Sequence, residues 1–299
     1  MSFYLFRKLS SVIILSIFAL IVVKTTSAAI PARKLTCKSV NGISPLFKRG
    51  NILLFGEIHG TQEIPAFIGD VVCLALKKKS PVILGLEIPS DEQPAIDRFL
   101  VSKGGKEAEA QLTKGAFWHR KSQDGSSYTD GRTSIAILQL MEQVRALRAA
   151  GSKVRIVAYD QIPGSGSQPR DAVMAENLTR LASREPKSLL VVLSGDVHTR
   201  LTRGTSWNKD FEPMGYLLSK SINSSRINSF AVSHEGGQAW VCAELPPDFK
   251  QACKPLPLKP KAGAPSWSVK LSAETDSPYT GTFGVGLIRA SPPVTGQSH

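Results

Sequence analysis

The 299-residue sequence lacks the motifs of several common activities. It contains no G-x-S-x-G turn for a serine nucleophile, no P-loop for nucleotide phosphates and no cysteine spacing of the kind that binds zinc. It also has no basic run interleaved with aromatic residues, as a groove for nucleic acid would need. These absences exclude the commonest nucleophile, nucleotide and zinc-finger chemistries and predict a protein that does not bind nucleic acid.

The chain has no concentrated block of charge, although it is basic overall. Its formal net charge is +13, which falls to +10 when Arg7, Lys8 and Lys24 of the N-terminal segment are subtracted. The excess is spread along the chain. It indicates solubility or affinity for anionic surfaces.

Long apolar runs are absent except near the N-terminus. There Arg7 and Lys8 precede an uncharged apolar stretch, Val12–Val23, and small residues follow. The pattern is typical of a secretory signal peptide, and the stretch is shorter than the ~20 residues that span a bilayer. We therefore expect cleavage of residues 1–28 rather than an uncleaved anchor. The mature chain would be exported to the periplasm or secreted, without a stable membrane span.

Cysteine is scarce, with four residues in the mature chain. Export makes disulfides available to them. Cys242 and Cys253 are the preferred pair because they close a short loop. A bridge between Cys37 and Cys73 is the weaker prediction, since Cys73 lies in an apolar helical segment where a free thiol packs as a small hydrophobe.

Short apolar runs alternate with helical patterns, which predicts an α/β fold with a mostly parallel central sheet and helices on both faces. About 270 mature residues suffice for one such domain. The expected strands are Asn51–Phe55, Pro81–Leu86, Val154–Tyr159 and Leu189–Leu193, and the expected helices are Gln62–Lys78, Asp91–Ser102, Ser134–Ala149 and Arg170–Arg184.

The pattern changes towards the C-terminus. Ser229–Ser233 and Ala239–Ala243 flank the letters EGGQ and predict an antiparallel β-hairpin on the C-terminal side. We therefore divide the chain into a signal peptide (1–28), one α/β domain (29–253) and a proline-rich extension (254–299). Within that extension we expect an irregular linker over 254–266, edge strands over 268–272 and 282–288, and a loose tail over 291–299.

Two apolar runs end in the same local pattern. LLFGEIHG contains Glu57 and His59, and LLVVLSGDVH contains Asp196 and His198. In an extended chain residues i and i+2 project to the same side. The sequence therefore predicts two acid–imidazole pairs, Glu57 with His59 and Asp196 with His198.

Other reactive side chains follow the remaining strands. Glu87 ends the second expected strand, and Tyr159 and Asp160 end the third. Ligands of open α/β sheets bind outside the carboxyl ends of the strands, where these groups would converge. Arg170, which opens a helix, and Arg132 are candidates to stabilise a developing oxyanion there.

This set of residues allows two kinds of chemistry. Glu57, His59 and His198 could hold a divalent ion such as Mn, Co or Zn and lower the pKa of its bound water. Alternatively, Glu57 or Glu87 could hold one imidazole in the tautomer that takes a proton from water without metal. A structural alternative treats both histidines as hydrogen-bonded core residues. The segment 115–132 could form a lid over the site or an ordinary surface loop.

The paired motifs GEIHGTQE and GDVH resemble the Gly-x-x-His motifs of the erythromycin esterase, ChaN and Tiki superfamily. LEIP, with Glu87, and RDAVMAENL, with Arg170, resemble further parts of its pattern, and the resemblance covers roughly residues 51–200. It implies an esterase that activates water with histidine and glutamate, a metal-dependent protease, or a haem-binding envelope protein. For haem iron, Tyr159 is the evident strand-end tyrosine.

We therefore expect an exported hydrolase of ester or amide bonds that acts on a small-molecule or peptide substrate. The expected catalytic residues are Glu57, His59, Glu87, Arg170 and His198. The alternative is a haem- or metal-binding envelope protein of the ChaN type. The sequence does not indicate an oligomeric state.

Overall fold

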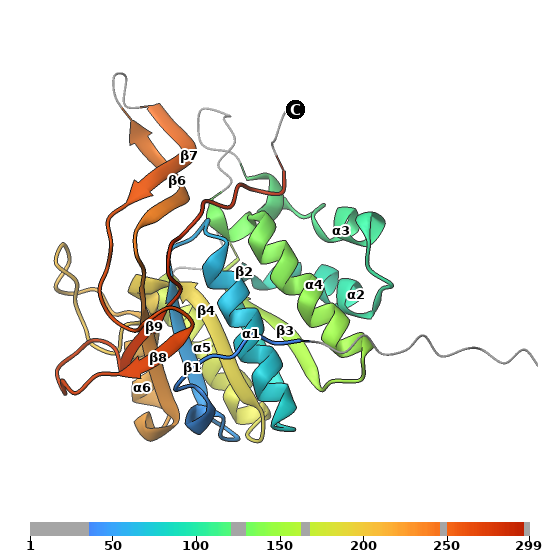
Figure 1. Cartoon of the computed structure of the whole chain (residues 1–299). Coiled ribbons are helices and arrows are strands. Elements are labelled where there is room, and N and C mark those ends of the chain that lie inside the picture. The colour runs from blue at the N-terminus through green and yellow to red at the C-terminus, as the bar shows by residue number, and fades with distance from the viewer. Residues whose placement is uncertain (1–35, 121–129, 163–167, 246–249, 296–299) are drawn as a thin grey trace, which may run out of the picture. The chain divides into compact units, whose positions relative to one another are not determined.

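A mostly parallel sheet forms the centre of the fold. The computed structural model describes residues 36–120, 130–162, 168–245 and 250–295. Within these residues, seven strands pair in the order β3-β2-β4-β1-β5-β9-β8 (Figure 1). Only the edge strand β8 of this described sheet is antiparallel to its neighbour. The strands are β1 (Ile52–Glu57), β2 (Val82–Pro89), β3 (Val154–Asp160), β4 (Leu189–Gly195), β5 (Ile227–Ser233), β8 (Ser268–Leu271) and β9 (Gly281–Gly284).

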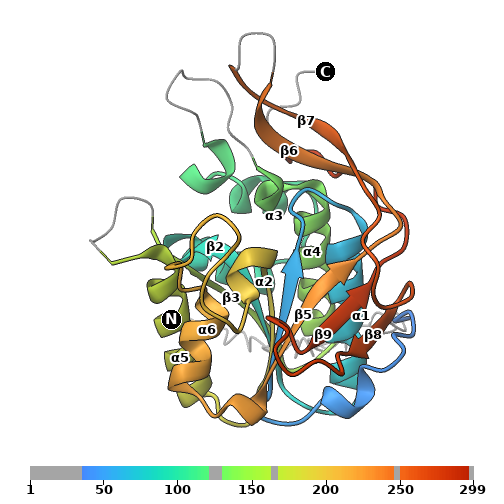
Figure 2. The same ribbon diagram turned by 90° about the vertical axis from the view of Figure 1, so that its left-hand side faces the viewer.

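Helices cover both faces of this sheet, as the sequence predicts. Figures 1 and 2 show α1 and α4 on one side and α5 and α6 on the other. The α-helices are α1 (Glu63–Lys77), α2 (Gln93–Val101), α3 (Lys106–Leu112), α4 (Ile135–Ala149), α5 (Arg170–Arg184) and α6 (Met214–Ser221). Short 3-10 helices are η1 (Ser44–Leu46), η2 (Ser90–Glu92), η3 (Ala116–His119), η4 (Gly131–Thr133), η5 (Asp196–Thr199) and η6 (Ser224–Arg226).

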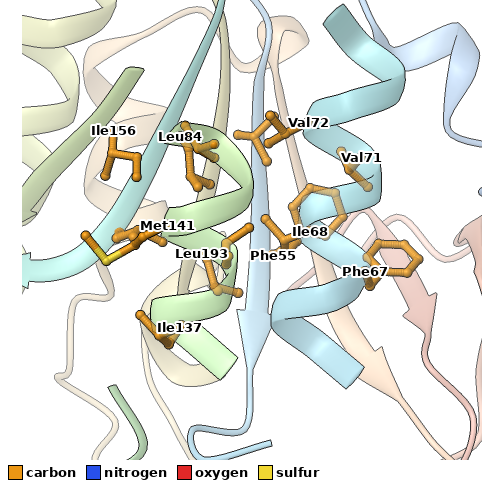
Figure 3. Close-up of a cluster of buried hydrophobic side chains, with 14 of the residues drawn as sticks. Phe55, Phe67, Ile68, Val71, Val72, Leu84, Ile137, Met141, Ile156 and Leu193 are labelled. Atoms are coloured by element: carbon orange, nitrogen blue, oxygen red, sulfur yellow. The ribbon is translucent and has the colours of Figure 1, made fainter. Parts of the chain in front are cut away.

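The apolar runs become central strands because both of their faces are buried. In β1, Leu53 and Phe55 join the cluster under α1 and α4, while Ile52 and Leu54 join the cluster under α5 and α6. Figure 3 shows the first cluster, with Phe55 facing the side chains of α1. A strand buried on both sides has no polar alternation, which is typical of parallel sheets. The four strands and four helices predicted before residue 195 are confirmed to within a few residues at their ends.

The strand order brings the motif ends together. Strand β4 lies between β1 and β2, and all three are parallel. Glu57 at the end of β1 is in register with Gly195 at the end of β4. The carboxyl ends that carry Glu57, Glu87 and Gly195 therefore share one edge of the sheet.

An antiparallel hairpin is present on the C-terminal side, but only one of its two expected strands was predicted correctly: 239–243 lie in β6 (Gly237–Leu245), whereas 229–233 belong to β5 of the main sheet. Strand β5 pairs in parallel with β1 and β9, and the antiparallel partner of β6 is β7 (Lys250–Leu258). The EGGQ segment does not close a hairpin between β5 and β6, because these strands lie in different sheets and Gln238 N donates to Ile288 O instead. The chain leaves the main sheet there and forms a separate two-stranded hairpin (Figure 2).

Two further expectations about the C-terminal part were wrong. Residues 254–258, expected in an irregular linker, belong to β7. Ser291 of the expected loose tail is buried, its hydroxyl accepts from Ala136 N, and Val294 N donates to Thr133 O. The two expected strands are present as β8 and β9, but only β8 lies at the edge of the sheet. The boundary drawn at residue 253 falls inside β7, and β9 completes the same sheet as β1.

Both cysteine pairs form disulfides. Cys242–Cys253 joins β6 to β7 as predicted, and Cys37–Cys73 ties the start of the described chain to α1. The bridge between Cys37 and Cys73, the weaker of the two predictions, is therefore present as well. Cys73 is buried as expected, and Cys37 reaches it across the same apolar cluster.

Two predictions concern parts of the chain outside the described residues. The signal peptide lies wholly there, and so do residues 121–129 of the expected 115–132 lid. The start of that segment is buried, since Phe117 and Trp118 pack into the main core. Among the helices that the structure describes, none has the length and apolar character to cross a bilayer.

Candidate functional site

The first motif forms the predicted pair. The chain leaves β1 at Glu57, and His59 Nδ1 lies 3.0 Å from Glu57 Oε1. An ionised carboxylate can only accept, so the imidazole proton sits on Nδ1. The Glu57 side chain is 3% exposed and that of His59 is 27% exposed. The carboxylate is therefore buried, whereas the imidazole is partly accessible to solvent.

The loop after His59 is held from two sides. Gly60 has a φ of 74°, and its carbonyl accepts from Trp240 N and Ser291 N, each at 2.8 Å. A Cβ at Gly131 would lie 1.8 Å from Gly60 N, so η4 packs directly on this backbone. The hairpin strand β6 and the C-terminal segment thus help to fix the imidazole position.

The second motif does not form the predicted pair. Residues 196–199 form the 3-10 helix η5 rather than an extended chain, so Asp196 and His198 do not point the same way. Asp196 Oδ2 lies 3.2 Å from Lys261 Nζ. His198 Nδ1 instead lies 2.8 Å from Asp171 Oδ2, in the first turn of α5.

Asp171 is a site residue that sequence reasoning missed. It is buried, and Oδ2 also accepts from Met214 N at 2.8 Å. The sequence gives only one signal for Asp171, its position after Arg170 in the first turn of a helix. An acidic residue is common there because it interacts favourably with the helix dipole, so the position does not by itself indicate a site. The partner of His198 therefore comes from a different element than the repeated pattern suggests.

Glu87 lies at the centre of the site. Its Oε2 accepts from Ser194 Oγ at 2.7 Å and from Gly195 N at 2.6 Å. Its Oε1 accepts from Arg170 Nη2 and lies 3.8 Å from His59 Nε2. The carboxylate thus ties β2 to β4 and also contacts groups from both motifs.

Both candidate arginines join this centre. Arg170 donates to the two carboxylate oxygens of Asp160 at 2.8 and 2.7 Å, and Arg132 donates to Asp160 at 3.0 Å and to Glu87 at 3.3 Å. Asp130 holds Arg132 from its other side at 2.9 Å. Two guanidinium groups are therefore fixed between three buried or half-buried carboxylates.

The two imidazoles approach one point. A Cβ placed on Gly195 would lie 3.0 Å from His59 Nε2 and 3.4 Å from His198 Cδ2. His198 Nε2 also accepts a hydrogen bond from Arg170 Nη1 at 3.1 Å. The ring edges opposite the two carboxylate-bound nitrogens thus face a common space over Gly195.

Electrostatics sets the charge of the groups in this space. Burial lowers the pKa of His59, but the charges of Glu57 and Glu87 outweigh it and raise that pKa to about 9. Burial opposes ionisation of Glu87, yet His59 and Arg132 hold its pKa well below the usual value. At neutral pH the site therefore holds an imidazolium against an ionised Glu87.

The predicted metal ligands do not fit a divalent ion. Nε2 of His59 could coordinate an ion while Nδ1 donates to Glu57, but Nε2 of His198 faces Arg170 and is not available to the same ion. Within the described ranges, no three His, Cys, Asp or Glu side chains converge as ligands would. A cation near His198 would also have to displace a guanidinium, which already supplies the positive charge.

Tyr159 lies in the core beside the site. It is buried with Met174 and Leu178, and its hydroxyl donates to Leu193 O at 3.2 Å. Burial and the charge of Glu87 raise the pKa of this phenol well above its usual value. In this position it packs as a core residue and does not offer a phenolate to haem iron.

Comparisons with known proteins bear on the fold. No family model and no curated protein matches the chain. Similar solved structures include a protein from Bacillus cereus, with a TM-score of 0.55 and 12% identity over 83% of this chain and 91% of that one. The open conformation of a variant of erythromycin esterase EreC gives 0.53 and 12% over 72% and 78%. ChaN of Campylobacter jejuni, described with cofacially bound haem, gives only 0.41 and 15% over 64% and 84%.

At these identities, the first two similarities establish a shared fold. They agree with the fold expected from the resemblance of the Gly-x-x-His motifs to the erythromycin esterase superfamily. The chain therefore has the α/β fold that is also seen in erythromycin esterase EreC.

Proposed function

We propose that the protein is an exported hydrolase of ester or amide bonds, related to the erythromycin esterase superfamily, in which His59 activates a water molecule. The observation that carries this proposal is the pair of imidazoles over Gly195, each with Nδ1 held by a carboxylate. Nε2 of His59 is left at the partly exposed side of its ring, whereas Nε2 of His198 accepts from Arg170. An imidazole with one nitrogen held by a carboxylate and the other accessible suits proton transfer.

His59 is the general base of this proposal. With its proton on Nδ1 directed at Glu57, the neutral ring presents the Nε2 lone pair to the open side of the site. A water held there gives its proton to Nε2 as its oxygen attacks the carbonyl carbon of the substrate, and the carbonyl oxygen takes up the negative charge. When this intermediate collapses, the C–O or C–N bond to the leaving group breaks, and the imidazolium returns the proton to the departing alcohol oxygen or amine nitrogen. Because the pKa of His59 is about 9, the neutral form is a minor species at pH 7, and kcat/KM should rise with pH towards 9.

Arg170 supplies charge for the oxyanion. Its guanidinium is locked to Asp160 and Glu87, and its Nη1 points at His198. His198, fixed by Asp171, accepts this bond and keeps the guanidinium at the edge of the open space. A preorganised cation of this kind stabilises charge that develops on a carbonyl oxygen.

The proposal runs without a metal or haem. Arg132 and Arg170 provide the positive charge that a divalent ion would bring, and Tyr159 is committed to the core. The chain keeps the fold of a named esterase, which favours an ester or lactone over other carbonyl substrates. Two disulfides suit a protein of an oxidising compartment, in line with export to the periplasm or beyond.

The test is turnover of a panel of small esters, lactones and amide-linked peptides by the purified mature protein and its His59→Ala variant. We expect hydrolysis of at least one class by the wild type and a loss of at least ~10²-fold in the variant, whose unfolding midpoint stays close to that of the wild type. Retained activity in the variant would refute the role of His59. A haem titration that produces a Soret band sensitive to His59→Ala would favour the binding-protein alternative instead.

A further inference from the structure

A polar cavity adjoins the 3-10 helix that carries His198. It has a volume of about 590 Å³, and η5 contributes Asp196 and Val197 to its wall. Because most of its other lining residues fall within 200–209, we call it the loop cavity. The proposed mechanism uses none of these residues.

The loop cavity has an excess of positive charge. Four cations line it against a single carboxylate, Asp196; they are Arg200, Arg203, Lys209 and Lys261. A concave surface lined by one sign of charge concentrates the opposite charge more strongly than a flat one. The cavity is therefore suited to an anion.

Two of the four cations are not neutralised by the protein. Lys261 pairs with Asp196 at 3.2 Å, and Arg203 pairs with Asp210 at 3.1 Å. Arg200 instead lies with its guanidinium 5.9 Å from the ring of Tyr279, and within the described residues neither Arg200 nor Lys209 forms an ion pair. An incoming anion would therefore meet two positive charges that no carboxylate of the described residues neutralises.

The wall of the loop cavity is preformed. Gly204 N donates to Phe211 O at 2.8 Å, Thr205 N donates to Asn208 O at 2.8 Å, and Asn208 N donates back to Thr205 Oγ1 at 3.0 Å. Gly204 takes a φ of 85°, which suits the turn. A loop closed by its own hydrogen bonds has less conformational entropy to lose when a ligand binds.

An aromatic surface accompanies the charge. Trp207 lines the loop cavity and remains 77% exposed, and Tyr279 contributes a second ring. Exposed tryptophan beside cations suits a ligand with an apolar or ring-shaped part next to its anionic group. The same loop reaches the catalytic residues, because the Phe211 ring lies 6.4 Å from the imidazole of His198.

We propose that the loop cavity binds an anionic group of the substrate, either a carboxylate, a phosphate or a sulfate, next to an apolar or aromatic part. That the anion belongs to the substrate rests on the proposed hydrolase function, whereas anion binding by the cavity does not. The protein would then favour esters whose acid or alcohol portion carries a negative charge.

Binding is tested by titration calorimetry at low salt with benzoate and inorganic phosphate, and with neutral benzamide as the matched probe. We expect benzoate to bind saturably and benzamide not to bind. The Arg200→Gln and Lys209→Gln double variant should lose at least ~10-fold in benzoate affinity. The Lys187→Gln and Lys220→Gln double variant carries the same charge change on exposed residues away from the cavity and should bind as the wild type does. Absence of benzoate and phosphate binding, or equal loss in both double variants, overturns the proposal.

Two measurements separate this inference from the proposed function. His59→Ala should bind benzoate with unchanged affinity while losing turnover, so binding stands even if no ester is hydrolysed. In the wild type, an ester with a distal carboxylate should be preferred at least ~10-fold in kcat/KM over its neutral amide analogue, and the cavity double variant should lose that preference. A preference that survives in this variant would show that the cavity takes a free anion and not the substrate.

Discussion

The two Gly-acid-x-His segments share one sequence pattern but have different structures. In the first, the chain stays extended after β1 and Glu57 pairs with His59. In the second, the chain turns into η5, so Asp196 pairs with Lys261 and His198 takes Asp171 from α5. What the two segments share is the result, an imidazole whose Nδ1 donates to a buried carboxylate. Similar local sequence therefore predicts the placement of the imidazole better than its partner.

The largest effect should come from Glu87, the carboxylate that both segments approach. Glu87→Gln keeps the size of the side chain but leaves Arg170 and Arg132 with less negative charge and Gly195 N with a weaker acceptor. Breaking a buried ion pair from one side costs roughly 3–5 kcal/mol. We expect a loss of this size in the free energy of unfolding from chemical denaturation, together with loss of turnover.

The matched control for this change is Glu107→Gln, because Glu107 is exposed in α3. It should alter stability by less than ~0.5 kcal/mol. A Glu87→Gln protein as stable as the control would mean that the buried network contributes nothing to folding.

The next effect separates the true partner of His198 from the apparent one. In Asp171→Asn, the amide oxygen at the Oδ2 position can still accept from Met214 N and His198 Nδ1, but the NH₂ group takes the Oδ1 position, 3.0 Å from His198 Nδ1, and the negative charge beside the imidazole is lost. We expect kcat to fall about 10²-fold. Asp196→Asn removes only a pair with the half-exposed Lys261 and should change kcat less than about twofold. If the two substitutions were equal, or their order reversed, the assignment of Asp171 would be wrong.

This difference also marks how far sequence reasoning reaches. The ends of β1 and β2 can be predicted because each strand is an apolar run buried on both faces. Because the strands are parallel, their last residues lie at the same edge of the sheet. Glu57, His59 and Glu87 therefore lie side by side, as their places at the strand ends predict. Asp171 was missed because its carboxylate reaches His198 only through the packing of α5 against the sheet, a tertiary contact between residues 27 positions apart.

The C-terminal part shows the same limit. Ala239–Ala243 has the composition of a strand, but composition does not choose between β5 and β7 as its partner. The choice is made by Gly237, where a Cβ would lie 1.9 Å from Ile288 O, so that the chain passes close to the C-terminal segment before it pairs with β7. Close backbone approach of this kind depends on distant residues and has no local signal except the glycine itself.

A smaller effect should come from the motif glycines, which lie against each other's segments. A Cβ on Gly56 would lie 2.9 Å from Asp196 Cα, whereas a Cβ on Gly195 would lie 3.0 Å from His59 Nε2. Gly56→Ala meets backbone and should cost ~1–3 kcal/mol in the free energy of unfolding. Gly195→Ala meets the side chains of His59 and His198 instead of backbone and should lower kcat/KM more than stability. The free energy of unfolding and kcat/KM should both be measured for Gly56→Ala and Gly195→Ala. Equal losses of stability with equal kcat/KM in the two variants would contradict the prediction.

The finest difference between the two histidines concerns pH. The pKa of His59 is raised to about 9, so its folded-state protonation stabilises the protein fully below pH 6.5, and this contribution is lost as pH rises through 9. Glu57→Gln removes the largest charge that raises this pKa, while burial still lowers it. The variant should reach its plateau in kcat/KM at a lower pH than the wild type, and its stability should decline less between pH 6.5 and 9. Because Asp171 contacts His198 and not His59, Asp171→Asn should leave the position of that plateau unchanged even as it lowers its height. A plateau that moves with Asp171→Asn and not with Glu57→Gln would assign the base to His198 instead.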